Sequence, residues 1–152
     1  MPTLRHSIDA LLPHRPPMIL LDEVLSADET SLTAAVTIRE DSLFLEPGGV
    51  PSHIGIEYMA QACGAYAGLK ALERGEPVRV GFLLGTRRYE ARVPWLRLGD
   101  SMIVSVSEIY RDTQMGAFEC RIERQGELVA TAQLSVYQPE DVQSPQGEPQ
   151  LE

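Results

Sequence analysis

An α+β fold, with an antiparallel sheet wrapped around one long central helix, is predicted by three features of the sequence. Only one stretch, residues 52–74, carries a long helical pattern. The segments after residue 75 alternate apolar and polar residues over strand lengths. The short polar breaks between them, such as RDTQMG and RQGE, are typical of hairpin turns. A chain of 152 residues suits one domain, which we place at residues 1–138.

The elements before the long helix are short. SIDALL, residues 7–12, is typical of a brief helix with Ser7 as its N-cap, ended by Pro13. MILLDEVLSAD and SLTAAVTI, which follow, resemble the two strands of a hairpin. Residues 41–51, DSLFLEPGGVP, are dense in glycine and proline and predict a loop.

The long helix is expected to begin after Pro51, with Ser52 as its cap, and to stop at Gly75 and Pro77. Its side chains are unusually small, which would let the strands of a tightly curved sheet approach the helix backbone. These small residues are Ala60, Ala62, Gly64, Ala65, Ala67 and Gly68.

Four further strands are expected in VRVGFLLGTRRYEARV, DSMIVSVSEIYRD, AFECRIERQ and LVATAQLSVYQ. Residues 139–152 are acidic and lack apolar periodicity, so we expect a disordered tail.

Composition excludes some classes of function. The formal net charge of −9 argues against a nucleic-acid-binding protein. No apolar run approaches the ~20 residues that cross a bilayer, and no secretory leader is evident, so a cytoplasmic protein without a membrane partner is expected. Cys63 and Cys120 fit no metal-ligand spacing and are expected to be buried free thiols. The residues from Lys70 to Arg97 include seven basic side chains. They could form a local basic surface that binds an acidic partner or a phosphate.

One face of the long helix carries the candidate chemistry. Residues four apart lie along one stripe of a helix, so His53, Glu57, Gln61, Gly64 and Gly68 share a face. The Gln61 amide can orient the Glu57 carboxylate, and the two glycines leave room for an alkyl or polyene chain. The same gaps could instead admit a strand or a helix of a second subunit.

Two interpretations of Glu57 remain open from the residues alone. It is either an ordinary helix acid, exposed or paired with an arginine, or a group that transfers protons beside His53. Its neighbours Ile54, Ile56 and Met59 favour a desolvated carboxylate, the state that suits general acid–base catalysis.

Three segments, in the same order as in the family, resemble the FabZ-type 3-hydroxyacyl-acyl-carrier-protein dehydratases. They are LLPHRPPMILLDEVL, GIEYMAQACGAYAG and GFLLGTRRYEARVPWLRLGDSMIVSVSEI, and together they span about residues 8–138. HIGIEYMAQ is nearest to the ApeP-like branch, which occurs in aryl polyene and similar polyketide biosynthesis. The resemblance implies the hotdog fold, in which a sheet wraps one central helix, and a dimer with active sites at the subunit interface.

The resemblance also implies roles for residues. Glu57 corresponds to the helix acid that protonates the departing hydroxyl, and Gln61 to its orienting amide. The backbone N–H that polarises the thioester carbonyl falls at Ser52 or His53. Gly64 and Gly68 would line the substrate slot. The family's loop histidine, however, falls here near Leu43, which cannot accept a proton; His14 matches a structural residue of the family.

Three functions follow from this departure. His53 replaces the missing base in a working dehydratase; or Glu57 acts alone, as in hotdog thioesterases; or the chain is a non-catalytic hotdog subunit that supports an active partner. The assembly would be a homodimer or a heteromer with another hotdog chain. Each function implies an acyl carrier protein as partner, and no cofactor or metal beyond the substrate's phosphopantetheine. The expected docking residues are Arg87, Arg88, Arg92 and Arg97.

Overall fold

The computed structural model describes residues 19–77, 82–112 and 114–137. The predicted helix at residues 7–12 and the predicted tail at 139–152 lie outside this part of the chain. The described elements are β1 (Glu23–Ala27), β2 (Ser31–Thr37), β3 (Val50–Pro51), the 3₁₀ turn η1 (Ser52–Ile54), α2 (Gly55–Glu73), β4 (Phe82–Ala91), β5 (Trp95–Leu96), β6 (Ser101–Arg111), β7 (Met115–Arg124) and β8 (Glu127–Tyr137).

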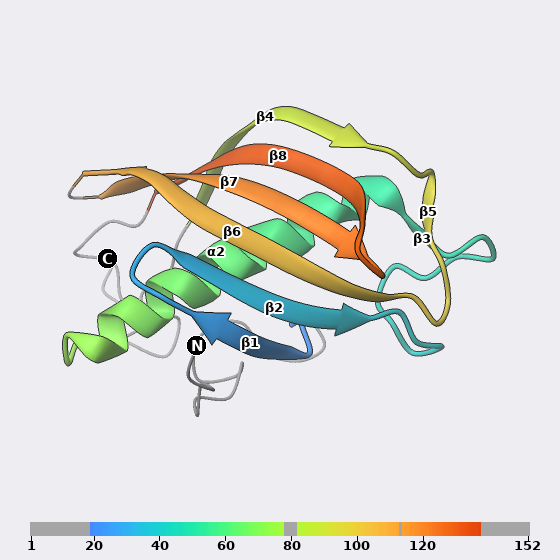
Figure 1. Cartoon of the computed structure of the whole chain (residues 1–152), viewed down its shortest axis with the longest axis horizontal. Helices are drawn as coiled ribbons and strands as arrows, with labels where there is room; N and C mark the ends of the chain where they lie inside the picture. The colour runs from blue at the N-terminus through green and yellow to red at the C-terminus, as the bar shows by residue number, and fades with distance from the viewer. Residues whose placement is uncertain (1–18, 78–81, 113, 138–152) are drawn as a thin grey trace, which may run out of the picture.

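Six strands form one antiparallel sheet in the order β1-β2-β6-β7-β8-β4. The sheet curls around α2, which lies across its concave side (Figure 1). This confirms the predicted architecture and is the arrangement expected of a hotdog fold. The predicted hairpin of β1 and β2 is also confirmed, and it continues into the sheet through the pairing of β2 with β6.

The core fills the space between α2 and the sheet. On β7 every second residue faces the helix and is buried, namely Gly116, Phe118, Cys120 and Ile122. On the helix side Met59, Ala62 and Ala65 are fully buried. The buried small side chains of α2, such as Ala62 and Ala65, therefore let the sheet pack close to the helix, as the sequence predicts.

The loop at residues 41–51 ends differently from the prediction. Val50 and Pro51 form the short strand β3, which pairs with β5 in a second, two-stranded sheet. Gly49 makes this pairing possible: its φ is +121°, and a Cβ there would stand 2.5 Å from the Leu96 carbonyl oxygen. A two-residue strand carries no periodicity, so a sequence pattern cannot reveal it.

The start of the long helix is also corrected. The chain first makes one 3₁₀ turn, Ser52–Ile54, and the α-helix begins at Gly55 with Ile54 at its N-cap position. No side chain caps either element, so the predicted capping role of Ser52 is wrong. A 3₁₀ turn at a helix N-terminus tightens the backbone, so the first N–H groups need other partners.

The two cysteines lie at the seam between helix and sheet. Cys63 of α2 and Cys120 of β7 are buried free thiols, as predicted, with their Sγ atoms 3.8 Å apart. Burial is the main reason why the pKa of the Cys63 thiol is raised well above its usual value. Among the described helices, none is both long and apolar enough to span a membrane.

Candidate functional site

A narrow strip of α2 and the turn before it faces away from the sheet. His53 and Glu57 are exposed, and Ala60 and Gly64 are half-buried, whereas most other residues of the helix are buried. The spacings of four, three and four residues keep the strip on one helical face. We call these four residues the helix strip. It brings together the two predicted catalytic side chains and one of the two predicted substrate-lining glycines; Gly68 is buried outside it.

The exposure of Glu57 corrects an expectation. Its apolar neighbours in the sequence favour a desolvated carboxylate, yet within the single chain this carboxylate is exposed. The reason is helical geometry, since Tyr58 and Met59 turn toward the interior while Glu57 turns outward. No hydrogen bond or ion pair reaches the side chain of Glu57 or His53 from the described residues.

Gln61 has a structural contact that the sequence did not suggest. It is buried, with 6% of its surface exposed, and its Oε1 accepts a hydrogen bond of 2.8 Å from the Leu20 backbone N–H. The side chain therefore ties the segment before β1 to the middle of α2. Its predicted role in orienting Glu57 stays a prediction.

The backbone N–H groups of Ser52 and His53 are the two candidates for binding a thioester carbonyl, and that of Ser52 already donates a hydrogen bond. The Ser52 N–H donates to the Pro94 carbonyl at 3.0 Å, so it is not available to a substrate in this conformation. No partner from the described part of the chain reaches the His53 N–H in the backbone hydrogen-bond pattern. The predicted carbonyl-binding role of Ser52 is therefore disfavoured, and the His53 amide is the remaining candidate.

Tyr89 fixes the turn that presents these amides, and sequence reasoning missed it. Its hydroxyl donates to the Ser52 carbonyl, which joins β4 to η1. Burial raises the pKa of Tyr89 to about 12, so the hydroxyl keeps its proton at neutral pH. A Cβ on Gly55 would stand 2.5 Å from this hydroxyl oxygen, so the contact requires a glycine at the start of α2.

Replacing Gly55 with alanine is expected to lower the free energy of unfolding by roughly 1–3 kcal/mol, because the added methyl group collides with the Tyr89 hydroxyl. Urea unfolding measures the loss. The Tyr89→Phe variant removes the colliding oxygen, so Gly55→Ala should cost less in that background. Equal costs in both backgrounds would show that the collision is not the cause.

The loop where the resemblance places the family's histidine carries Leu43 instead. Leu43 is half-buried and lines a pocket beside Tyr58, on a side of α2 that the helix strip does not reach. Further along, Pro47, Gly48 and Gly49 line an open groove with Trp95 and Arg97. The ring of Trp95 lies close against Gly48, where a Cβ would meet it at 2.9 Å.

The predicted docking arginines are all exposed, but they do not form an uninterrupted basic surface. Arg87 and Arg88 lie at a bulge of β4, where Arg88 adopts a φ of 53° and donates to Gln133 at 2.9 Å. Glu90 and Glu119 border the same hollow as Arg88.

Two other bases of the segment are neutralised locally. Lys70 pairs with Glu73 at 3.6 Å, and Arg74 pairs with Glu76 at 3.1 Å. The basic surface is therefore smaller than the sequence suggests. Within the described residues, no group of three or more His, Cys, Asp or Glu side chains could hold a metal ion.

Known sequences match almost the whole chain. The model of the ApeP-like family, described as ApeP dehydratase, matches residues 6–146. The 3-hydroxyacyl-[acyl-carrier-protein] dehydratase FabZ of Chlamydia pneumoniae is 33% identical over 139 residues, which cover 87% of this chain and 89% of that protein. FabZ of Streptococcus thermophilus is 28% identical over 135 residues, 86% of this chain and 93% of its own.

Solved structures agree with these matches. A chain of the dehydratase heterocomplex ApeI:P from Xenorhabdus doucetiae superposes with a TM-score of 0.87 and 33% identity, covering 91% of this chain and 94% of that one. The PaaI protein of E. coli, at a TM-score of 0.60 and 14% identity, shares the fold alone. The family match, the FabZ relatives and the six-stranded sheet around α2 give one conclusion: the chain is a dehydratase-like protein with the hotdog fold and belongs to the ApeP-like family.

Proposed function

We propose that this chain is a subunit of a dehydratase that removes water from 3-hydroxyacyl thioesters carried on an acyl carrier protein. The observation that carries the proposal is the helix strip. In a dehydratase family, a largely buried helix leaves exposed the acid at the family's acid position, together with a histidine one turn before it. A carboxylate with no partner among the described residues is available to a substrate.

The chemistry of the reaction assigns the roles. A base removes a proton from the α-carbon, the bond between the β-carbon and the hydroxyl oxygen breaks, and Glu57 protonates the oxygen as it leaves as water. The His53 N–H would hold the thioester carbonyl while negative charge develops on its oxygen. A second subunit covering the strip would exclude water from the reacting groups.

The source of the base separates two forms of the proposal. In a homomer, the His53 imidazole of one chain would be the base, and Glu57 of the other chain would be the acid. In a heteromer, a second hotdog chain would supply the loop histidine that this chain replaces with Leu43. The match to a chain of a dehydratase heterocomplex supports the heteromer.

The carrier protein is proposed to dock through exposed arginines on β4 and after it, and through the groove beside Trp95. Acyl carrier proteins are acidic, and Arg87, Arg92 and Arg97 present guanidinium groups to solvent. The groove lined by Trp95 and Arg97 has a volume of about 700 Å³, enough for an extended arm. The products would feed fatty acid, aryl polyene or related polyketide synthesis.

The test is an intact-mass assay with a 3-hydroxyacyl-acyl-carrier protein. The full chain is incubated alone and together with a hotdog dehydratase chain that carries the loop histidine. Loss of one water by the chain alone would establish the homomer, and His53→Ala should then abolish it. If this chain alone removes no water, and the mixture removes it faster than the partner chain alone, the result would establish the heteromer. Release of the acyl group, or no change of mass in either sample, would overturn the proposal.

A further inference from the structure

The pocket that Leu43 lines beside Tyr58 lies next to α2, outside the helix strip. It has a volume of about 240 Å³ and forms between the segment before β1, the end of β2, the following loop and α2. None of the helix-strip residues lines it. Its walls combine apolar and polar side chains, namely Ile19, Leu20, Asp22, Val36, Thr37, Arg39, Asp41, Ser42, Leu43 and Tyr58.

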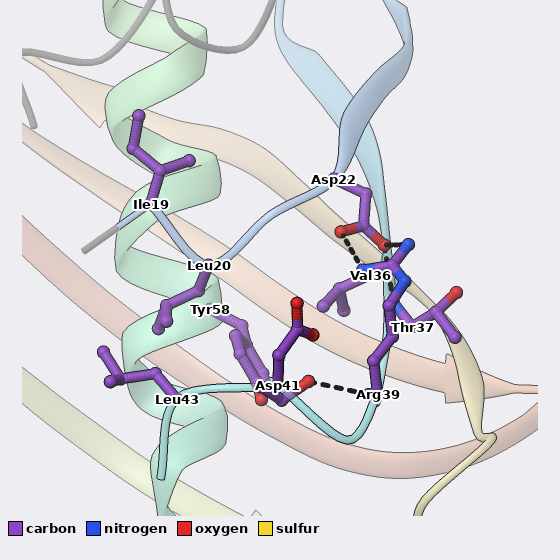
Figure 2. A pocket seen from close by; sticks show the side chains of 10 residues that line it. Ile19, Leu20, Asp22, Val36, Thr37, Arg39, Asp41, Leu43 and Tyr58 are labelled. Carbon is purple, nitrogen blue, oxygen red and sulfur yellow. Dashed lines mark hydrogen bonds and ion pairs between the residues drawn. The ribbon is translucent and has the colours of Figure 1, made fainter. Parts of the chain in front are cut away.

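Tyr58 is the unusual residue of this pocket. Its side chain is only 2% exposed, and its hydroxyl finds no hydrogen-bond partner among the described residues. Figure 2 shows its ring reaching from α2 past Leu43 toward the loop that carries Asp41. A buried hydroxyl without a partner destabilises a fold, so native proteins seldom retain one without a functional reason.

The other two tyrosines that contact α2 or the turn before it show the contrast. Tyr66, on the same helix and equally buried, donates to the Glu29 carbonyl at 2.7 Å. The Tyr89 hydroxyl donates to the Ser52 carbonyl. Of these three tyrosines, only Tyr58 lines this pocket, and its hydroxyl has no hydrogen-bond partner from the described chain.

The charges around the pocket limit what it can hold. Both terminal nitrogens of Arg39 contact the Asp22 carboxylate, at 2.9 and 3.1 Å, and Asp22 also accepts from the Thr37 N–H at 2.8 Å. The charges of Arg39 and Asp22 cancel, so the net negative charge of the pocket lining comes from the exposed Asp41 carboxylate. The carboxylate points back into the pocket (Figure 2). An anion would be repelled there, whereas a neutral group that donates a hydrogen bond would be held.

The Tyr58 hydroxyl acts as a donor in this setting. Burial, with a smaller contribution from the negative charge of Asp22, raises the pKa of Tyr58 to about 12. A ligand atom that accepts from Tyr58 and donates to Asp41 satisfies both groups, and a hydroxyl group can do both.

We propose that this pocket binds a small neutral ligand whose hydroxyl group bridges Tyr58 and Asp41 and whose apolar body packs on Ile19, Leu20 and Leu43. A cavity of about 150 Å³ holds a benzene ring. The pocket, at about 240 Å³, therefore has room for a ring with one or two substituents. The proposal assigns no role to Glu57 or His53, because no residue of the helix strip lines the pocket.

The first test compares the thermal stability of two matched variants of the full chain without added ligand. Tyr58→Phe removes an unpaired buried hydroxyl and should raise Tm by about 2–4 °C. Tyr66→Phe removes a paired hydroxyl from the same helix and should lower Tm. A Tm of Tyr58→Phe equal to or below that of the wild type would overturn the proposal, because the hydroxyl would then have a partner already.

The second test measures binding by NMR chemical-shift titration with three probes of similar shape. The wild type should bind p-cresol more tightly than toluene, which has no hydroxyl, and more tightly than 4-methylbenzoate, which is anionic. Tyr58→Phe should weaken the binding of p-cresol about 3- to 10-fold, and Tyr66→Phe should not. Asp41→Asn should reduce the discrimination against 4-methylbenzoate. Equal binding of the three probes, or equal effects of the two tyrosine variants, would overturn the proposal.

Discussion

Glutamine in place of Glu57 is expected to slow dehydration about 10²- to 10⁴-fold, the contribution of a well-placed general acid. Glutamine keeps the size and hydrogen-bonding capacity of the side chain but cannot donate a proton to a leaving hydroxyl. The fold should be almost unaffected, because Glu57 is exposed and, within the described part of the chain, contributes only a negative charge in the first turn of α2. Such a charge contributes about 0.3–1 kcal/mol. Single-turnover rates and Tm are the two measurements.

The matched control for this variant is Glu73→Gln. Glu73 is an exposed glutamate at the opposite end of the same helix, paired with Lys70 and remote from the helix strip. Its replacement should leave the dehydration rate unchanged. A rate for Glu57→Gln close to that of the wild type would exclude Glu57 as the acid. A large fall in Tm would assign it a structural role instead.

Phe118→Ala is expected to lower the free energy of unfolding by about 3–5 kcal/mol. Phe118 is 1% exposed at the centre of β7, and its ring meets Tyr66 edge-on with 5.6 Å between centroids. Protein cores relax only partly around a deleted side chain, so we expect a cavity to remain. Trp95 is the single tryptophan of the chain, and its fluorescence follows urea unfolding from a distant element.

An exposed aromatic residue on the neighbouring strand is the control for Phe118. Tyr110 on β6 is 57% exposed, so Tyr110→Ala should change stability by no more than about 0.5 kcal/mol. Similar losses in the two variants would mean that unfolding does not report on the packing of α2 against the sheet.

Most of the fold could be predicted because its long elements repeat their pattern several times. The strands β6, β7 and β8 and the helix α2 are each ten or more residues long, so the pattern of each has room to repeat. By contrast, β3 and β5 have two residues each, and their pairing depends on a close approach at Gly49 that only coordinates reveal. The 3₁₀ turn at Ser52 was missed for the same reason, since three residues establish no period.

The candidate site was predicted less completely than the fold. Spacing placed His53 and Glu57 on one face, and the structure agrees. Spacing also placed Gln61 there, but a stripe of residues four apart drifts around the helix, and by Gln61 it has turned into the interior. The pairing of Ser52 with Pro94 and the unpaired hydroxyl of Tyr58 depend on segments far apart in the chain, so no local pattern could show them.

The two thiols between the helix and the sheet are a native probe of how often α2 separates from β7. Cys63 and Cys120 face each other across the boundary between α2 and β7, and both are buried. A thiol-specific reagent can reach them only when the helix lifts from the sheet, since the burial that excludes the reagent also keeps Cys63 protonated and unreactive. The rate of labelling therefore reports how often this seam separates, without any inserted probe.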